Sequence, residues 1–369
     1  MMKVSKESNL GVLCQGQGTQ KPGMFKALLS SENEHIRRAA GEVLEGHLKQ
    51  IKPEIFDIYY NEGIDAARVN STVNVQPAIA ASTMIWHKAL EYTVGEKIVP
   101  NVGGGYSLGD FVATNMLGVL SDHDTLSLAA LRGEVFITIK PGQFYVLTLI
   151  TKDTAHVTRL NRTLRGGYRV TVRNGPNIVT VAGPVSSRDK LEQIVTRWKQ
   201  DETVTREIVL DKEVFFVPFH HTRELADVAT FFESQVIKYC DRESKARNQH
   251  VFLEPHGIFV TNDGRRFTNG TEIMHYLASR HIKNLCDFDR TMRNVGGIAS
   301  TVIGFGDLNF QRRTALQNGY IQNFVVVNEP GSLQAAARAY EGVLEYRSGQ
   351  GAIAAEKSRV QKQLHVATS

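Results

Sequence analysis

Ser107 lies in a short glycine-rich stretch whose spacing could present it as a nucleophile. The pentapeptide 105–109, Gly-Tyr-Ser-Leu-Gly, follows an apolar run and precedes a segment with the pattern of a helix. A serine on such a strand-to-helix turn points out from the top of a sheet at the positive end of a helix, where N–H groups can receive an oxyanion. A glycine-rich turn in any α/β protein has the same letters, so the pentapeptide alone leaves both interpretations open.

Two other residues stand out by their type and position, and each also has an ordinary interpretation. His220 follows a proline that ends an apolar strand, a place suited to a general base, with His221 as its neighbouring competitor. Arg132 lies in a mostly apolar helical segment, and its ordinary interpretation is a residue on a solvated helix face.

A glycine-rich loop near the start of the chain lies after a short apolar strand and contains Gln17. Its glycines at 16, 18 and 23 do not have the spacing of a dinucleotide fingerprint. No Gly-Lys-Ser/Thr follows, which excludes a phosphate loop. We therefore expect a loop that offers backbone amides to a nearby site.

The elements that must position these residues are those of an α/β protein with an insertion. Strand, helices, strand, turn and helix follow one another in the first part of the chain, and a β-α-β-β-α-β order in the middle is that of a ferredoxin-like unit. We expect a large α/β-hydrolase-like subdomain with a parallel sheet over 1–140 and 212–331. A ferredoxin-like small subdomain over 141–211 and a helical C-terminal extension over 332–369, broken at its glycines, complete the prediction.

The amino-acid composition excludes several classes of protein. The 369 residues are 42% hydrophobic and 22% charged, as in an ordinary globular protein. Three cysteines without a close pair argue against a disulfide framework or a zinc site and favour a reducing compartment. The polar start and the lack of a long apolar run predict a cytoplasmic protein that does not act at a membrane.

The net charge of +5 is a mild excess of basic residues. No dense Lys/Arg run is interleaved with aromatic residues, so we expect no nucleic-acid partner. An acidic protein or a phosphate-bearing substrate would suit this charge, and so would a merely solvated basic face.

Six motifs in order resemble the malonyl-CoA:acyl-carrier-protein transacylase family, including discrete polyketide-type acyltransferases. The resemblance runs from about Gly11 to about Gly306. The motifs are Gly-Gln-Gly-Thr-Gln at 16–20, Gln-Pro-Ala at 76–78, the pentapeptide at 105–109, Leu-Arg-Gly at 131–133, a turn and strand over 174–183, and Pro-Phe-His at 218–220.

The resemblance implies a role for each candidate residue. Ser107 would be the nucleophile and His220 its base, while backbone N–H groups of Gln17 and Leu108 would form the oxyanion hole. Arg132 would pair with the free carboxylate of the malonyl group.

The same resemblance implies a reaction. The malonyl group would pass from coenzyme A to the phosphopantetheine thiol of a holo acyl carrier protein through an O-acyl serine, in polyketide or fatty-acid biosynthesis. Malonyl-CoA would be a substrate, and neither a permanently bound cofactor nor a metal is expected.

Two departures from the family pattern and one further match mark possible neighbours of the site. Tyr106 stands where the family usually has histidine, and His281 stands where it has a glutamine near the Ser-His pair. Phe219, before His220, fits the bulky residue of malonyl-selective polyketide acyltransferases.

Alternative functions stay open at this point. A sister interpretation is the malonyl-loading subunit of malonate decarboxylase. An acyl-carrier-protein acyl hydrolase would use the same Ser-His pair, although Arg132 argues against hydrolysis of neutral acyl chains. A non-catalytic carrier-binding module is disfavoured, because Ser107, His220 and Arg132 are present together.

Overall fold

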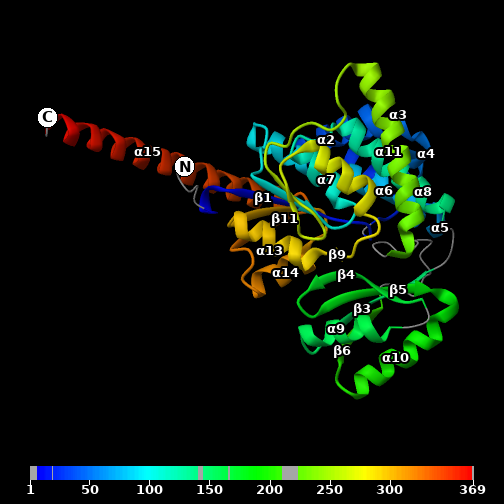
Figure 1. Cartoon of the computed structure of the whole chain (residues 1–369). Coiled ribbons are helices and arrows are strands. Elements are labelled where there is room, and N and C mark those ends of the chain that lie inside the picture. The colour runs from blue at the N-terminus through cyan, green and yellow to red at the C-terminus, as the bar shows by residue number, and fades with distance from the viewer. Residues whose placement is uncertain (1–5, 19, 140–143, 165–166, 210–222, 368–369) are drawn as a thin grey trace.

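The computed structural model describes residues 6–18, 20–139, 144–164, 167–209 and 223–367 (Figure 1). Two predicted site residues, Phe219 and His220, lie outside the described residues.

The large subdomain is built on a six-stranded sheet in the order β11-β10-β1-β2-β7-β8. The first five strands are parallel and β8 is antiparallel, so the predicted parallel sheet is confirmed. Cys14 pairs with Gly105, so the carboxyl ends of β1 and β2 meet at one edge of the sheet. The strands are β1 (Leu10–Cys14), β2 (Val102–Gly105), β7 (Ile258–Val260), β8 (Arg266–Phe267), β10 (Thr301–Phe305) and β11 (Asn323–Val327).

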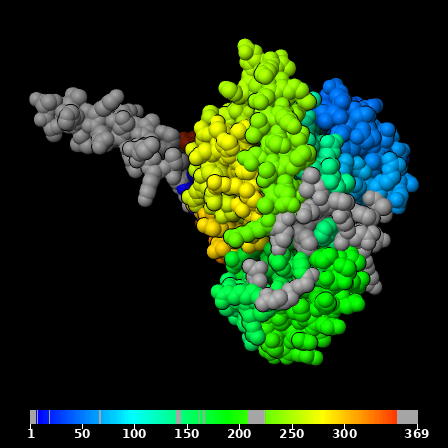
Figure 2. All heavy atoms as spheres, turned by 45° about the vertical axis from the view of Figure 1, so that its right-hand side comes forward, coloured from blue at the N-terminus to red at the C-terminus, as the bar shows by residue number. Residues whose placement is uncertain are grey.

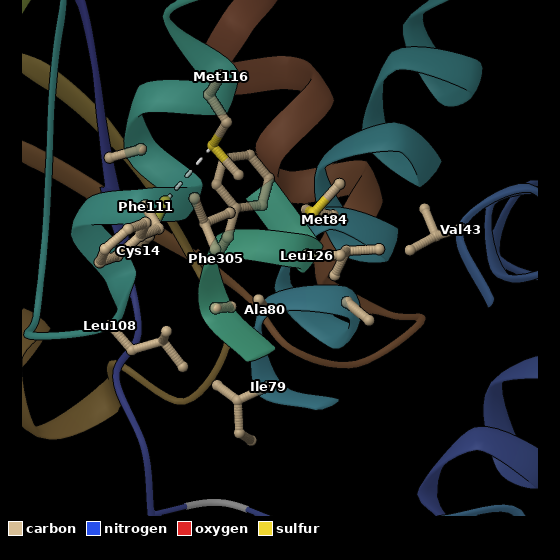
Figure 3. Packing of buried hydrophobic residues seen from close by; sticks show 14 of the residues in the cluster. Cys14, Val43, Ile79, Ala80, Met84, Leu108, Phe111, Met116, Leu126 and Phe305 are labelled. Carbon is tan, nitrogen blue, oxygen red and sulfur yellow. Dashed lines mark hydrogen bonds between the residues drawn. The ribbon is translucent and has the colours of Figure 1, made fainter. Parts of the chain in front are cut away.

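Helices cover both faces of this sheet because side chains of successive strand residues point to opposite sides. Val12 and Cys14 lie in one hydrophobic cluster, with Phe305 and Leu126, while Leu13 lies in the other (Figure 3). On the first face lie α6 (Thr72–Val94) and α7 (Gly109–Met116), with α8 (Asp122–Ile139) and α11 (Ala226–Arg247) packed outside them. On the second face lie α13 (Phe288–Ile298) and α14 (Asn309–Gln317). Other α-helices of this subdomain are α1 (Met24–Leu29), α2 (Glu34–Ala40), α3 (Lys49–Ile51), α4 (Pro53–Tyr60), α5 (Ala66–Val69) and α12 (Gly270–His275). Two π-helical segments, Gly41–Leu48 and Tyr276–Arg280, continue α2 and α12.

Two prolines act differently on the helices that contain them. Pro53 is the first residue of α4, a position that proline favours because its missing N–H has no partner there. Pro77, in contrast, lies inside α6, which begins at Thr72.

The small subdomain is an antiparallel sheet with the order β6-β3-β5-β4, which is the ferredoxin-like order predicted from the sequence. Figure 2 shows it in green as a lobe beside the large subdomain. A short strand of the large subdomain, β9 (Cys286–Asp287), extends this sheet by pairing with β4. The elements of the small subdomain are β3 (Phe144–Thr151), α9 (Thr154–Thr163), β4 (Arg169–Gly175), β5 (Ile178–Pro184), α10 (Arg188–Gln200) and β6 (Val204–Val209). The boundaries 141–211 stay a prediction, because both fall on residues outside the described ones.

The C-terminal segment is a single helix, α15 (Ser332–Ala367), which extends away from the body of the molecule (Figure 1). The predicted break at Gly349 and Gly351 is therefore wrong; a glycine lowers helix stability without forcing the helix to end. The first turns of α15 belong to the core, since Leu333 and Tyr340 are buried there. None of the helices in the described ranges is long and apolar enough to span a membrane.

Candidate active site

The turn between β2 and α7 holds Ser107 in the left-handed backbone conformation, with φ +52°. Glycines make this turn possible because the backbone segments approach closely. A Cβ added at Gly105 would lie 1.9 Å from the carbonyl carbon of Gly109, and one at Gly109 would lie 2.3 Å from the oxygen of Cys14. The Tyr106 N–H donates to the Cys14 oxygen at 2.9 Å, which ties the turn to β1. The glycines on either side of Ser107 therefore serve the close approach that the sequence motif predicted.

Arg132 points from α8 to Ser107. Its Nη2 lies 3.4 Å from the Ser107 Oγ, and its Nη1 donates to the Gln76 Oε1 at 2.7 Å. The side chain is only 1% exposed, so its interpretation as a solvated helix residue is wrong. No carboxylate of the described residues lies within 4.0 Å of the guanidinium. Burial lowers the pKa of Arg132 to about 9, and the nearby Asp110 opposes this shift.

A chain of polar side chains leads from Arg132 to the first glycine-rich loop. Gln76 donates from Nε2 to the Thr72 Oγ1 at 3.0 Å, and the Thr72 hydroxyl donates to the Gln17 Oε1 at 3.4 Å. Within the described part of the chain, the backbone N–H groups of Gln17 and Leu108 donate to no protein acceptor. Both amides remain available for a ligand, as the predicted oxyanion hole requires. Gln76 was recognised in the sequence as part of a motif but was not predicted as a site residue.

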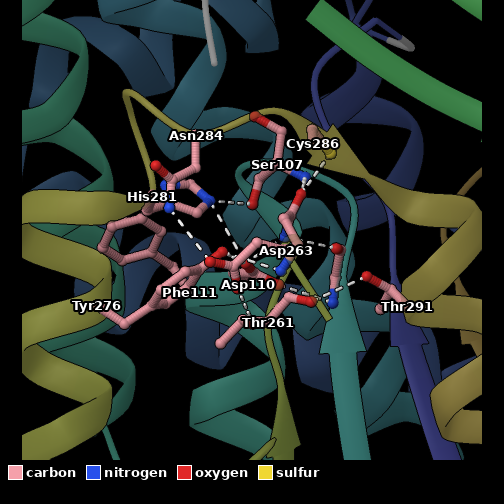
Figure 4. A network of polar contacts seen from close by, with 12 residues as sticks. Ser107, Asp110, Phe111, Thr261, Asp263, Tyr276, His281, Asn284, Cys286 and Thr291 are labelled. Atoms are coloured by element: carbon pink, nitrogen blue, oxygen red, sulfur yellow. Dashed lines mark hydrogen bonds and ion pairs between the residues drawn. The ribbon is translucent and has the colours of Figure 1, made fainter. Parts of the chain in front are cut away.

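His281 lies next to Ser107, and a ring nitrogen contacts the Ser107 carbonyl oxygen (Figure 4). Its ring is fully buried, and Nε2 lies 3.0 Å from the Ser107 carbonyl oxygen and 3.5 Å from the Asp110 Oδ2. A carbonyl oxygen only accepts, so Nε2 carries the hydrogen. The predicted site neighbour thus contacts the backbone of Ser107 and not its Oγ.

Asn262 is a residue of the site that sequence analysis missed. It follows β7, whose register with β2 pairs Val260 with Gly104, so the amide lies level with the serine turn. Its Oδ1 accepts the Ser107 N–H at 2.9 Å, and its Nδ2 donates to the Gly105 oxygen at 3.0 Å. In the sequence it belongs to Thr-Asn-Asp-Gly, an ordinary turn pattern, so only the order of strands in the sheet could reveal it.

Asp110 and Tyr276 complete the buried polar cluster under the turn. One oxygen of Asp110 accepts the Gly105 N–H at 2.9 Å, while the other accepts from Asn262 and from the Tyr276 hydroxyl. Burial raises the pKa of the Asp110 carboxyl well above its usual value, although these hydrogen bonds oppose the rise. The Tyr276 hydroxyl in turn accepts the Asn262 N–H at 2.9 Å. These hydrogen bonds link Asp110, Asn262 and Tyr276 into one continuous network under the serine turn.

Tyr106 joins the turn to the small subdomain. Its ring packs edge-on against Phe288, with centroids 5.2 Å apart, and Tyr106 packs against the hydrophobic cluster that includes Val172 of β4. Burial raises the pKa of this phenol, which stays neutral. The tyrosine therefore contacts both subdomains at the position next to Ser107.

Comparison with known proteins places this geometry in a family. Residues 12–254 match the model of the acyl transferase domain. A non-reducing polyketide synthase, ustP of Ustilaginoidea virens, is 28% identical over 187 residues, which are 50% of this chain and 9% of that protein. The malonyl CoA-acyl carrier protein transacylase of Bacillus subtilis is 29% identical over 147 residues, 39% of this chain and 34% of that protein.

A solved structure has the same fold. It is a type II polyketide synthase acyl-carrier protein in complex with its malonyl-transacylase, and it aligns with a TM-score of 0.70 and 18% identity over 89% of this chain and 99% of that chain. The family model matches more than half of this chain. The protein is therefore a member of the acyl transferase domain family.

Proposed function

We propose that this chain is a malonyltransferase, which moves a malonyl group from coenzyme A to the phosphopantetheine thiol of an acyl carrier protein. The observation that carries the proposal is Arg132, a residue that is 1% exposed, whose guanidinium lies 3.4 Å from the Ser107 Oγ with no carboxylate of the described residues within 4.0 Å. A buried cation of this kind calls for an anionic ligand. An acyl group on the Ser107 Oγ would place a distal carboxylate within reach of Arg132, whereas acetyl or fatty acyl groups would leave the cation unpaired.

The first half-reaction acylates the serine. The Ser107 Oγ bonds to the thioester carbonyl carbon while its proton passes to a base, which we propose is His220. Backbone N–H groups of Gln17 and Leu108 stabilise the oxyanion. The C–S bond then breaks, and the coenzyme A sulfur leaves with the proton that the base had taken.

The second half-reaction reverses these steps with a different thiol. The phosphopantetheine thiol gives its proton to the base and attacks the serine ester, and Ser107 regains its hydroxyl as the malonyl thioester forms. The partner proposed here agrees with the solved complex of a carrier protein with its malonyl-transacylase. A positively charged enzyme, +5 overall, suits an acidic carrier. Three free cysteines suit the reducing cytoplasm that we propose as its location.

Covalent labelling tests this function. The protein and its Ser107→Ala variant are mixed with radiolabelled malonyl-CoA or acetyl-CoA, and the acyl-enzyme is isolated by gel electrophoresis. We expect malonyl label on the native protein only, and faster transfer to a holo carrier protein than to water. Equal labelling by acetyl-CoA would refute the argument from Arg132, and release mainly to water would favour the hydrolase instead.

A further inference from the structure

Side chains from a distant segment hold both peptide groups of Ser107. Asn262 Oδ1 accepts its N–H at 2.9 Å, and His281 Nε2 donates to its carbonyl oxygen at 3.0 Å. Asn262 is 155 residues away in sequence and His281 is 174 residues away. The same carbonyl also accepts the Asp110 N–H at 2.9 Å, as the first turn of α7 forms.

The conformation of Ser107 explains why such support is needed. Its φ of +52° is in the left-handed region, which costs energy for a residue with a Cβ. Strained backbone of this kind persists only where surrounding contacts fix it. The two side chains fix the peptide groups on either side of the Ser107 Cα, and thereby the direction of its Cβ–Oγ bond.

Asn262 and His281 are themselves immobilised. Asn262 also binds Gly105 and Asp110 through Nδ2. The His281 ring lies between the rings of Phe111 and Tyr276, with centroids 5.6 Å and 5.8 Å away. Among the described residues, Asn262 and His281 hydrogen-bond to the backbone of Ser107, whereas the side chain that lies 3.4 Å from its Oγ is that of Arg132. The effect proposed for the two residues therefore acts through the backbone of Ser107.

We propose that Asn262 and His281 are positioning residues, which clamp the peptide groups of Ser107 and so aim its Oγ at the space beside Arg132. This proposal rests on Ser107 being the nucleophile of the proposed function. It does not depend on the acyl group that the serine carries.

The test uses a serine-directed alkyl fluorophosphonate, whose reaction requires no malonyl group. The Ser107 Oγ bonds to phosphorus, the P–F bond breaks, fluoride leaves and the hydroxyl proton passes to the base. The maximal rate constant and the half-saturating concentration are measured separately for each variant by intact-protein mass spectrometry, and malonyl-CoA labelling is measured in parallel.

Three variants isolate the hydrogen bond from His281. His281→Asn withdraws the donor from the Ser107 oxygen, and we expect the maximal rate constant to fall on the order of 100-fold with an unchanged half-saturating concentration. His281→Gln keeps a nitrogen donor at similar reach, and we expect it to stay within about tenfold of the native protein. The matched control is His87→Asn, because His87 is also buried (6% exposed) but packs against Phe305, away from the serine turn.

Each outcome decides the proposal. Equal rate constants for His281→Asn and His87→Asn would overturn it, as would a loss in His281→Gln as large as in His281→Asn. If His281→Asn does not fold, Asn262→Ser must show the same loss confined to the maximal rate constant. Failure of malonyl-CoA to label a protein whose fluorophosphonate reaction depends on His281 would refute the proposed function and leave the clamp standing. Absence of any reaction at Ser107 in the native protein would refute both.

Discussion

Replacing Arg132 by methionine should separate function from stability. Methionine fills much of the same volume but carries no charge, so the variant loses the partner proposed for the malonyl carboxylate. Removing one partner of a buried, hydrogen-bonded ion pair costs about 3–5 kcal/mol. At about 1.4 kcal/mol per factor of ten, kcat/KM for malonyl-CoA should fall by roughly two to three and a half orders of magnitude.

The same substitution should not lower the stability of the protein without bound ligand, although it lowers the activity. Arg132 is 1% exposed and has no carboxylate of the described residues within 4.0 Å, so burial of its charge destabilises the fold. The hydrogen bond with Gln76 Oε1 offsets about 1 kcal/mol of this cost. We therefore expect the free energy of unfolding of Arg132→Met to equal or exceed that of the native protein.

The assay combines two measurements on the same preparation. Stopped-flow release of coenzyme A gives kcat/KM for malonyl-CoA and acetyl-CoA, and urea unfolding followed by circular dichroism gives stability. Arg247→Met is the control, since Arg247 binds Asp124 and Glu243 at 2.9 Å and 2.8 Å. We expect this control to lose stability without changing the preference for malonyl. A loss of malonyl and acetyl transfer by the same factor in Arg132→Met, together with a loss of stability, would refute the reasoning.

Three other changes have defined outcomes. Gly105→Ala places a Cβ 1.9 Å from backbone of the serine turn, so we expect loss of serine labelling and a fall in unfolding temperature. Gln76→Leu removes the acceptor of Arg132 Nη1 and should raise KM for malonyl-CoA about tenfold while acetyl-CoA labelling changes little. His87→Leu should flatten the pH dependence of stability: burial, with help from Lys88, lowers the pKa of His87 to about 3 from 6.5. The unfolded chain then binds the extra proton between these values, so the free energy of unfolding of the native protein falls as pH falls through that window, by up to about 1.4 kcal/mol per unit.

A specific result would contradict each of these three predictions. Gly46→Ala, at a glycine whose added Cβ meets nothing within 4 Å, is the control for Gly105→Ala, and equal labelling of the two would contradict the steric argument. An unchanged KM for malonyl-CoA in Gln76→Leu would show that Arg132 needs no support from Gln76. Parallel stability curves of the native protein and His87→Leu between pH 6.5 and pH 4 would show that His87 is protonated in the folded protein.

The sequence by itself determined the features that depend on neighbouring residues. The pentapeptide 105–109 predicted a serine turn because glycines two residues either side of Ser107 permit a close approach that no other residue type allows. Strand and helix order predicted the parallel sheet and the ferredoxin-like insertion, since alternation and turn residues are local signals. The break expected at Gly349 was wrong because helix propensity is a weak preference, which the helical context overrides in α15.

Only the tertiary structure decided how the site is supported. The side chain of Arg132 could face solvent or the core, and the packing of α8 against α6 places it 1% exposed beside Ser107. Asn262 had no signal beyond a turn, and His281 was marked only as a departure from a family pattern. Asn262 reaches Ser107 because β7 lies next to β2 in the sheet, a pairing between segments more than 150 residues apart. His281 reaches it from the end of the helical segment Tyr276–Arg280. The local sequence determines the conformation of the turn. The hydrogen bonds that hold this conformation come from segments that are distant in sequence and that only the fold brings close to it.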